Sequence, residues 1–213
     1  MGNVMTKRRW LWLVPVVFYA AFCFWYTGGG KLSQKEVAHF LELFERQGMA
    51  TERLARLEAF MEADTGKQFF MLNAIDMAEN PILPKGAKDG SSAGDLMNHY
   101  MEYMFPALFA RACHPVFFGS AIAPAMDIVN AEGMEVWDSA ALFRYRTRRD
   151  MLEIASNPAF DERHDYKFAA LDKTIAYPTE ATLYYADPRV MLFLILGLIT
   201  ALLDIVLFGR RKA

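Results

Sequence analysis

Residues 68–77 read QFFMLNAIDM, and this short stretch is apolar on both of its alternating sets of side chains. The first set is Phe69, Met71 and Ile75, and the second is Phe70, Leu72 and Ala74. Because successive side chains of a β-strand point to opposite faces, a strand of this kind must be covered on both faces. The sequence therefore predicts a central strand of a sheet at residues 68–77.

The segments that follow the central strand alternate between helix and strand. Apolar residues at helical spacing predict a helix over residues 95–113, although Pro106 must kink or end it. Residues 116–122 predict a second strand, which residues 126–129 extend. Residues 137–147 (WDSAALFRYRT) alternate in the manner of a half-buried third strand.

The last part of the domain predicts a broken helix and a final strand. The helical region starts at Asp150, breaks at Asn157 and Pro158, and then resumes along an apolar stripe. The stripe consists of His164, Phe168, Leu171 and Ile175. Residues 182–185 supply the final strand. The predicted order from residue 68 is strand, helix, strand, strand, helix, strand, which is the ferredoxin-like (βαββαβ) arrangement of an α+β fold.

Two extra helices precede this domain. Ser33 and Glu36 have the spacing of a capping box at the start of a helix that we expect over residues 33–47. A second apolar stripe predicts a helix over residues 51–63. We expect the two helices to form a hairpin at residues 31–66.

Long apolar stretches lie near both ends of the chain. As helices, residues 10–26 (WLWLVPVVFYAAFCFWY) and 190–208 (VMLFLILGLITALLDIVLF) would span about 25 Å and about 28 Å, close to the roughly 30 Å hydrocarbon core of a bilayer. We therefore predict two transmembrane helices, with the ferredoxin-like domain between them at residues 67–188. The alternatives are a cleaved signal peptide for the first stretch and a buried core helix for the second.

Basic residues flank the two spans on their outer sides. They are Lys7, Arg8 and Arg9 in the tail 1–9, and Arg210, Arg211 and Lys212 in the tail 209–213. The positive-inside rule places both tails in the cytoplasm. The main domain is then expected in the periplasm, and the protein in the inner (cytoplasmic) membrane of a bacterium.

The charge balance narrows the choice of partners. The chain has 23 Lys and Arg, of which 17 remain without the six basic residues of the tails. It has 25 Asp and Glu, of which 24 remain without Asp204, so the net charge of the domain is about −7. A domain this acidic is not expected to bind nucleic acid. The expected partners are the lipid bilayer and either a second copy of the chain or the subunits of a membrane protein complex.

Three stretches of the domain look familiar: HPVFFGSAIAP at residues 114–124, FRYRTRRDMLEI at 143–154 and SNPAFDERHDYKFAALDKTIAYP at 156–178. They resemble a family of small bacterial domains of unknown function in the dimeric α+β barrel superfamily. The resemblance covers roughly half of the chain, from Glu102 to Ala181. It implies a ferredoxin-like protomer that pairs sheet to sheet with a second copy. That superfamily includes monooxygenases, isomerases and haem-degrading enzymes, so the fold does not by itself choose a function.

Motifs for catalysis and for metal binding are missing from the sequence. The four histidines lack the spacing of a zinc site, and His99 with Glu102 is a one-turn pair that arises often by chance. There is no Gly-rich phosphate loop, no Gly-x-Ser-x-Gly and no Cys-x-x-Cys. We expect no metal, no cofactor and no catalytic residue. The sequence does not decide whether the protein is an enzyme, but it favours the absence of activity.

A basic cluster in this acidic domain suggests a ligand pocket. Arg144 and Arg146 share one face of the predicted third strand, where two guanidinium groups can clamp a carboxylate. The candidate ligand-binding residues are His99, Tyr103, Trp137, Arg144 and Arg146. The alternative is that the basic cluster pairs with nearby acidic residues or across a dimer interface. Those acidic residues are Asp150, Glu153, Asp161 and Glu162.

Three residues of the second span are candidates for helix packing. Gly197 and Ala201 form a small-x-x-x-small pattern that permits close approach of another helix. Asp204 costs roughly 2.5 to 3.5 kcal/mol at mid-membrane, and we expect it to reach toward Arg210 or Arg211.

Together these features predict a membrane-anchored accessory or interaction protein, whose external domain dimerises or docks on a larger membrane assembly. The alternative is a membrane-bound enzyme or sensor that binds a small apolar carboxylated molecule in a barrel cavity.

Overall fold

The computed structural model describes residues 2–209, which form two compact units. One unit is residues Gly29–Ala181, and the other combines the described parts of Met1–Gly28 and Thr182–Ala213. The helical hairpin therefore belongs to the same unit as the sheet. The finer division of the chain predicted from the sequence stays a prediction.

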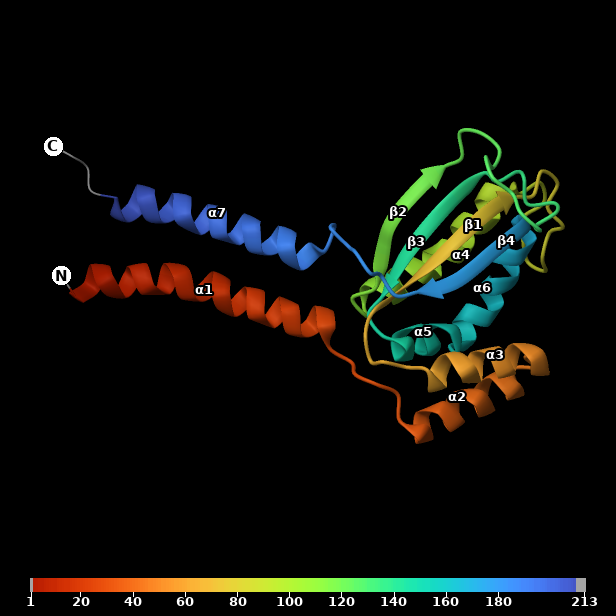
Figure 1. Ribbon diagram of the computed structural model, residues 1–213, viewed down its shortest axis with the longest axis horizontal. Coiled ribbons are helices and arrows are strands. Elements are labelled where there is room, and N and C mark those ends of the chain that lie inside the picture. The colour runs from red at the N-terminus through yellow and green to blue at the C-terminus, as the bar shows by residue number, and fades with distance from the viewer. Residues whose placement is uncertain (1, 210–213) are drawn as a thin grey trace. The chain divides into compact units, whose positions relative to one another are not determined.

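A four-stranded antiparallel sheet forms the centre of the domain unit (Figure 1). In chain order its elements are β1 (Phe69–Met77), α4 (Ala93–Phe109), β2 (His114–Ser120), β3 (Ser139–Tyr145), α5 (Arg148–Ala155), α6 (Pro158–Ala169) and β4 (Leu171–Thr179). The strand order is β2-β3-β1-β4, with β1 and β3 in the middle. This is the ferredoxin-like arrangement, so the predicted α+β fold is confirmed.

Helices α4, α5 and α6 cover one face of this sheet (Figure 1). Phe69 of β1 and Tyr145 of β3 stack on that face with ring centroids 5.2 Å apart. They pack in one buried cluster with Leu108 of α4 and Phe160 of α6. This cluster is the main core of the domain.

The final strand lies earlier in the chain than the sequence predicted. Leu171 and Ile175 continue the apolar stripe of α6 by their spacing, yet they belong to β4. The helix ends at Ala169 because β4 takes up the free edge of β1, where Ala74 faces Ile175. Residues 182–185 are not a strand, so that prediction was wrong.

The predicted extension of the second strand was also wrong. The ladder between β2 and β3 stops at Ser120 and Ser139, and residues 126–129 lie in the connection that follows. Asn130 and Gly133 adopt positive φ in this connection, which turns the chain back toward β3.

Helices α2 (Gln34–Arg46) and α3 (Thr51–Glu62) form the predicted helical hairpin. Ser33 caps α2 through the predicted capping box with Glu36. Phe40 and Phe44 of α2 pack against Met61 of α3 and Leu152 of α5. The hairpin is thus joined to the domain through a second, smaller apolar core.

The other unit contains α1 (Gly2–Thr27) and α7 (Pro188–Phe208), both long and apolar enough to cross a membrane. The two helices lie side by side, with the rings of Tyr19 and Phe193 5.6 Å apart. Near the chain ends, Arg8 donates to both carboxylate oxygens of Asp204, at 2.8 and 2.7 Å.

Candidate functional site

The face of the sheet opposite the helices carries two rows of small and apolar side chains. Residues that lie directly opposite one another in the ladder share a face, so the register defines these rows. The first row is Phe117, Leu142, Leu72 and Tyr177, and the second is Gly119, Ala140, Ala74 and Ile175. We call these eight residues the open sheet face.

The open sheet face is uncharged and partly exposed. Phe117 is 53% exposed, Tyr177 is 47% exposed and Ile175 is 41% exposed. Gly119 leaves room for the Phe117 ring, because a Cβ at Gly119 would lie 2.5 Å from Cζ of Phe117. Contiguous exposed apolar side chains of this kind mark interaction surfaces on soluble domains.

Arg144 closes one end of this face and is 1% exposed. Its Nη1 donates to the Ala112 carbonyl at 2.6 Å, and its Nε donates to Oε1 of Gln68 at 2.7 Å. Ala112 has a φ of 55° in the turn between α4 and β2, and the Arg144 bond holds its carbonyl in that turn. These contacts make Arg144 part of the architecture that joins β3 to the turn before β2.

Arg146 is engaged by the helix that follows it. Its guanidinium donates to both oxygens of Asp150, at 2.6 and 2.9 Å, and Asp150 also accepts from the Thr147 hydroxyl at 2.6 Å. The Asp150 carboxylate raises the pKa of the Arg146 guanidinium. This pair agrees with the interpretation that the basic cluster pairs with acidic residues of the next helix.

The three remaining ligand-binding candidates have separate surroundings. Nδ1 of His99 lies 3.3 Å from Oε2 of Glu102, beside a cavity of about 380 Å³. Tyr103 donates to the Ile154 carbonyl at 3.2 Å, and burial raises its pKa. Trp137 donates to the Met134 carbonyl at 2.9 Å, between β2 and β3. The structure therefore places His99 and Tyr103 on α4, Trp137 in the connection before β3, and Arg144 on β3 itself.

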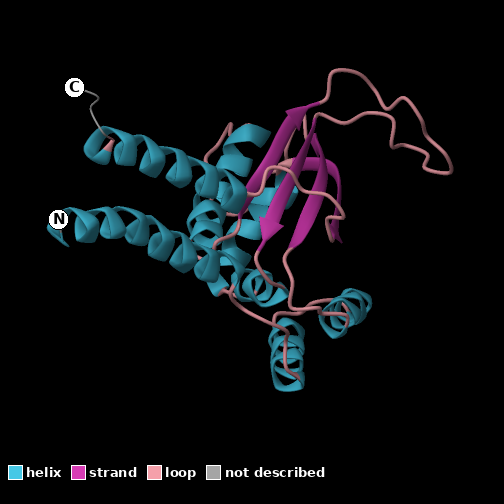
Figure 2. Cartoon of the chain, turned by 60° about the vertical axis from the view of Figure 1, so that its left-hand side comes forward, coloured by secondary structure: helices cyan, strands magenta, loops and turns pink. Residues whose placement is uncertain are grey.

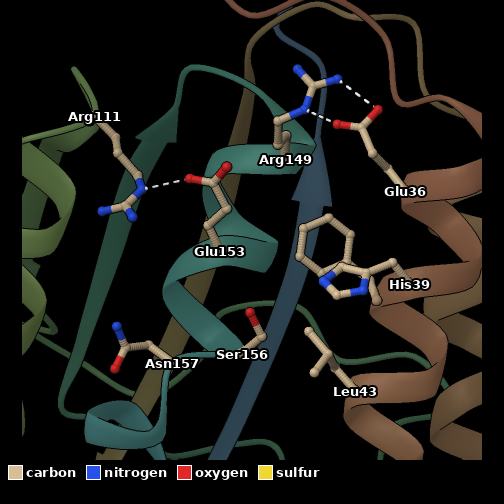
Figure 3. Close-up of a pocket in the computed structure, with 9 residues that line it drawn as sticks. Glu36, His39, Leu43, Arg111, Arg149, Glu153, Ser156 and Asn157 are labelled. Carbon is tan, nitrogen blue, oxygen red and sulfur yellow. Dashed lines mark hydrogen bonds and ion pairs between the residues drawn. The ribbon is translucent and has the colours of Figure 1, made fainter.

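A larger cavity of about 470 Å³ lies between α2 and α5 (Figure 3). Two ion pairs line it: Nε of Arg149 lies 2.6 Å from Oε1 of Glu36, and Nε of Arg111 lies 3.1 Å from Oε2 of Glu153. Arg149, with the Ser33 backbone N–H and hydroxyl, lowers the pKa of Glu36 to about 2. No residue of this cavity was predicted as a ligand-binding residue, because its charged pairs join segments far apart in sequence, by 113 residues for Arg149 and Glu36 and by 42 for Arg111 and Glu153.

Burial shifts the pKa values of two titratable groups of the domain, the half-buried His164 and the fully buried Cys113. Burial lowers the pKa of His164 to about 4, and the ring lies 4.5 Å from each of Phe160 and Phe168. Burial likewise raises the pKa of the Cys113 thiol to about 12, which suits a packed side chain rather than a nucleophile. Among residues 2–209, no cluster of His, Cys, Asp or Glu could hold a metal ion.

In the two-helix unit, Asp204 has a different partner from the one expected. The sequence pointed to Arg210 or Arg211, which lie outside the described residues, whereas Arg8 of α1 holds Asp204 in the structure. A Cβ added at Gly197 would meet nothing within 4 Å, so this position is open to another helix. The packing role of Gly197 and Ala201 stays a prediction.

Comparisons with known proteins inform the fold alone. No family model matches the chain, and no curated protein matches it. A protein of unknown function from Rhodopseudomonas palustris has a TM-score of 0.52 and 16% identity, over 64% of this chain and 96% of that chain.

Two further structures are similar to this chain at lower scores. A dimeric ferredoxin-like protein of unknown function from Jannaschia sp. CCS1 has a TM-score of 0.35 and 12% identity, over 54% of this chain and 99% of that chain. One from Bacteroides fragilis has a TM-score of 0.32 and 13% identity, over 54% of this chain and 96% of that chain. The resemblance to proteins of unknown function with this fold, expected from the sequence, is borne out by the Rhodopseudomonas palustris structure and by the strand order of the sheet.

Proposed function

We propose that this chain is a membrane-anchored interaction protein, whose ferredoxin-like domain pairs with a second copy through the open sheet face. The observation that carries the proposal is the pair of uncharged rows that crosses all four strands. Burial of such side chains contributes roughly 25 cal/mol for each Å² removed from water, and no charged group among them has to be desolvated.

A second copy fits this surface because a two-fold axis lays identical rows over one another. Phe117 lies at one edge of the face and Tyr177 at the other, so each copy offers an aromatic ring at both margins. The centre of the face holds the smaller Ala74 and Ala140, where two sheets can approach closely. Sheets pack face to face at about 10 Å in this way.

The second part of the proposal concerns the membrane. We propose that α1 and α7 span the inner membrane of a bacterium, with both tails in the cytoplasm and the domain in the periplasm. Support comes from their length and composition and from the basic residues Lys7, Arg8 and Arg9 in the N-terminal part of α1. Anchoring of all copies of the chain in the same bilayer raises the local concentration of their domains and so favours pairing.

Cysteine crosslinking in intact membranes tests the pairing. The full-length chain carries Cys23→Ser, and the remaining Cys113 is fully buried and shielded from reagents. We expect a bis-maleimide to link Tyr177→Cys into a species of twice the 24.3 kDa chain mass. The matched control is Glu162→Cys, an exposed position on α6, and it should stay monomeric. Equal crosslinking at both positions, or at neither, would contradict the proposal.

Labelling of the same control variant tests the orientation. A membrane-impermeant maleimide added to intact spheroplasts should modify Glu162→Cys as fully as it does after lysis. Labelling that appears only after lysis would place the domain in the cytoplasm and overturn the proposed topology.

A further inference from the structure

A second exposed surface lies in the connection between β2 and β3. We call residues 121–138 the arm, and Figure 2 shows this segment extending well beyond the ends of the strands. Its most exposed apolar residues are Ile122 at 100%, Met126 at 90% and Val129 at 80%. Exposure of 80% or more for three large apolar side chains within eight residues is unfavourable unless another molecule covers them.

Backbone hydrogen bonds hold the arm in an ordered conformation. The Ala121 N–H donates to the Asp138 carbonyl at 2.7 Å, and the Ala125 N–H donates to the Glu135 carbonyl at 2.8 Å. These bonds continue the pairing of the two chain segments past the end of the sheet. The arm is therefore already ordered before any partner binds, with its apolar side chains exposed. Binding a partner then costs the arm little conformational entropy.

A side chain from β4 holds the second half of the arm, which returns to β3. Nζ of Lys173 donates to the Gly133 carbonyl at 2.8 Å and lies 5.2 Å from the centre of the Trp137 ring. On the same side, the Asp138 carboxylate accepts from the Met77 N–H at 2.7 Å. Trp137, a ligand-binding candidate in the sequence, thus serves the base of the arm.

The arm carries four carboxylates and no Lys or Arg. They are Asp127, Glu132, Glu135 and Asp138. Within residues 2–209, none of the four forms an ion pair, whereas Glu36, Asp150 and Glu153 each pair with an arginine. The arm is therefore both apolar and negatively charged without internal neutralisation.

We infer that the arm docks on a different protein, at an apolar groove flanked by Lys and Arg side chains. Charge complementarity decides between the possible occupants. A second copy offers an acidic domain, and its arginines at positions 144, 146, 148 and 149 are already bonded within that domain. An anionic lipid surface repels the arm for the same reason. This docking is independent of the open sheet face, which carries the pairing proposed above.

Site-specific photocrosslinking of the full-length chain in native membranes tests this inference. A photoreactive phenylalanine analogue replaces Met126, and the matched control replaces Ile82, which is 88% exposed in a different loop. We expect the Met126 probe, and not the Ile82 probe, to form one discrete adduct with another protein. Mass spectrometry should map the crosslink to an apolar segment with adjacent Lys or Arg.

Two further measurements examine the charge requirement. At about 1 M salt the Debye length falls to about 3 Å, so the adduct should drop several-fold. The double variant Asp127→Lys with Glu132→Lys should lower the adduct to a similar extent. The Tyr177→Cys crosslink in that double variant should stay unchanged, which separates failure of the arm from failure of the sheet pairing.

Several results would overturn the inference. An adduct of twice the chain mass would assign the arm to a second copy, and an adduct with lipid alone would assign it to the bilayer. Equal adducts from Met126 and Ile82 would show non-specific exposure. An adduct whose yield changes neither with salt nor with charge reversal would rule out a partner with a basic surface.

Discussion

The two faces of the sheet are built from the same four strands but have opposite physical character. On the helix-covered face, Phe69 and Tyr145 are 1% and 8% exposed and stack within a closed core. On the open sheet face, Phe117 and Tyr177 remain about half exposed. Since neighbouring residues alternate between these faces, the comparison separates side chains that stabilise the fold from side chains available for contact.

The largest expected effect lies on the covered face. Phe69→Ala removes a fully buried ring from the stack with Tyr145 and leaves a cavity, which should lower the free energy of unfolding by about 3–5 kcal/mol. Urea unfolding of the full-length chain in detergent measures this. The matched change on the other face, Phe117→Ala, should cost less than about 1 kcal/mol. Similar losses in both variants would erase the distinction between the faces.

Arg144→Met tests the buried end of the open sheet face. The substitution leaves the Ala112 carbonyl and the Gln68 side chain without a buried donor, and we expect a loss of about 2–4 kcal/mol in the free energy of unfolding. The control Arg111→Met removes a partly exposed pair with Glu153 and a long bond of 3.3 Å to the Ala107 carbonyl, and it should cost about 1 kcal/mol or less.

This same variant also separates the two functions considered from the sequence. A folded, stable Arg144→Met protein that loses a small carboxylated ligand would favour the enzyme or sensor. An unstable protein agrees with the role of Arg144 in the architecture.

His164 should make the covered side of the domain sensitive to acid. Its folded pKa of about 4 lies below the ordinary value of 6.5, so the unfolded chain binds the proton more readily. The stability contribution is fully present above pH 6.5 and is lost as the pH falls toward 4. After allowance for its partial exposure, the loss is about 2 kcal/mol.

Chemical unfolding between pH 7 and pH 4 measures the effect of His164. The variant His164→Gln should flatten the profile in this window. A pH profile of His164→Gln identical to that of the parent chain would refute this assignment. The Glu36 carboxylate, with its pKa lowered from 4.5 to about 2, stabilises the fold above pH 4.5, and this contribution is lost as the pH falls toward 2.

The smallest effect on folding is expected on the open sheet face itself. Phe117→Ser should change the free energy of unfolding of the separate protomer by less than about 0.5 kcal/mol, because the ring is about half exposed. Its effect should appear instead in assembly, as a weaker dimer in crosslinking through Ile175→Cys. A destabilised protomer with unaltered assembly would reverse the roles assigned to the two faces.

Much of the fold was predictable because its signals are local. The capping box of Ser33 and Glu36, the doubly apolar strand at 68–77 and the two terminal spans depend on residues close together in the chain. The candidate site was less predictable. The open sheet face combines residues of four strands, and the bond between Arg149 and Glu36 joins positions 113 residues apart.

The sequence alone determined two membrane-compatible helices, a helical hairpin and a ferredoxin-like order of elements, since hydrophobic periodicity and caps are properties of short segments. Only the tertiary structure decided that Leu171 and Ile175 join a strand, that Arg144 is buried and bonded, and that Asp204 meets Arg8. The physical reason is that a spacing of three or four residues fits a helix locally. A strand forms in its place when a partner edge, distant in the chain, supplies the hydrogen bonds.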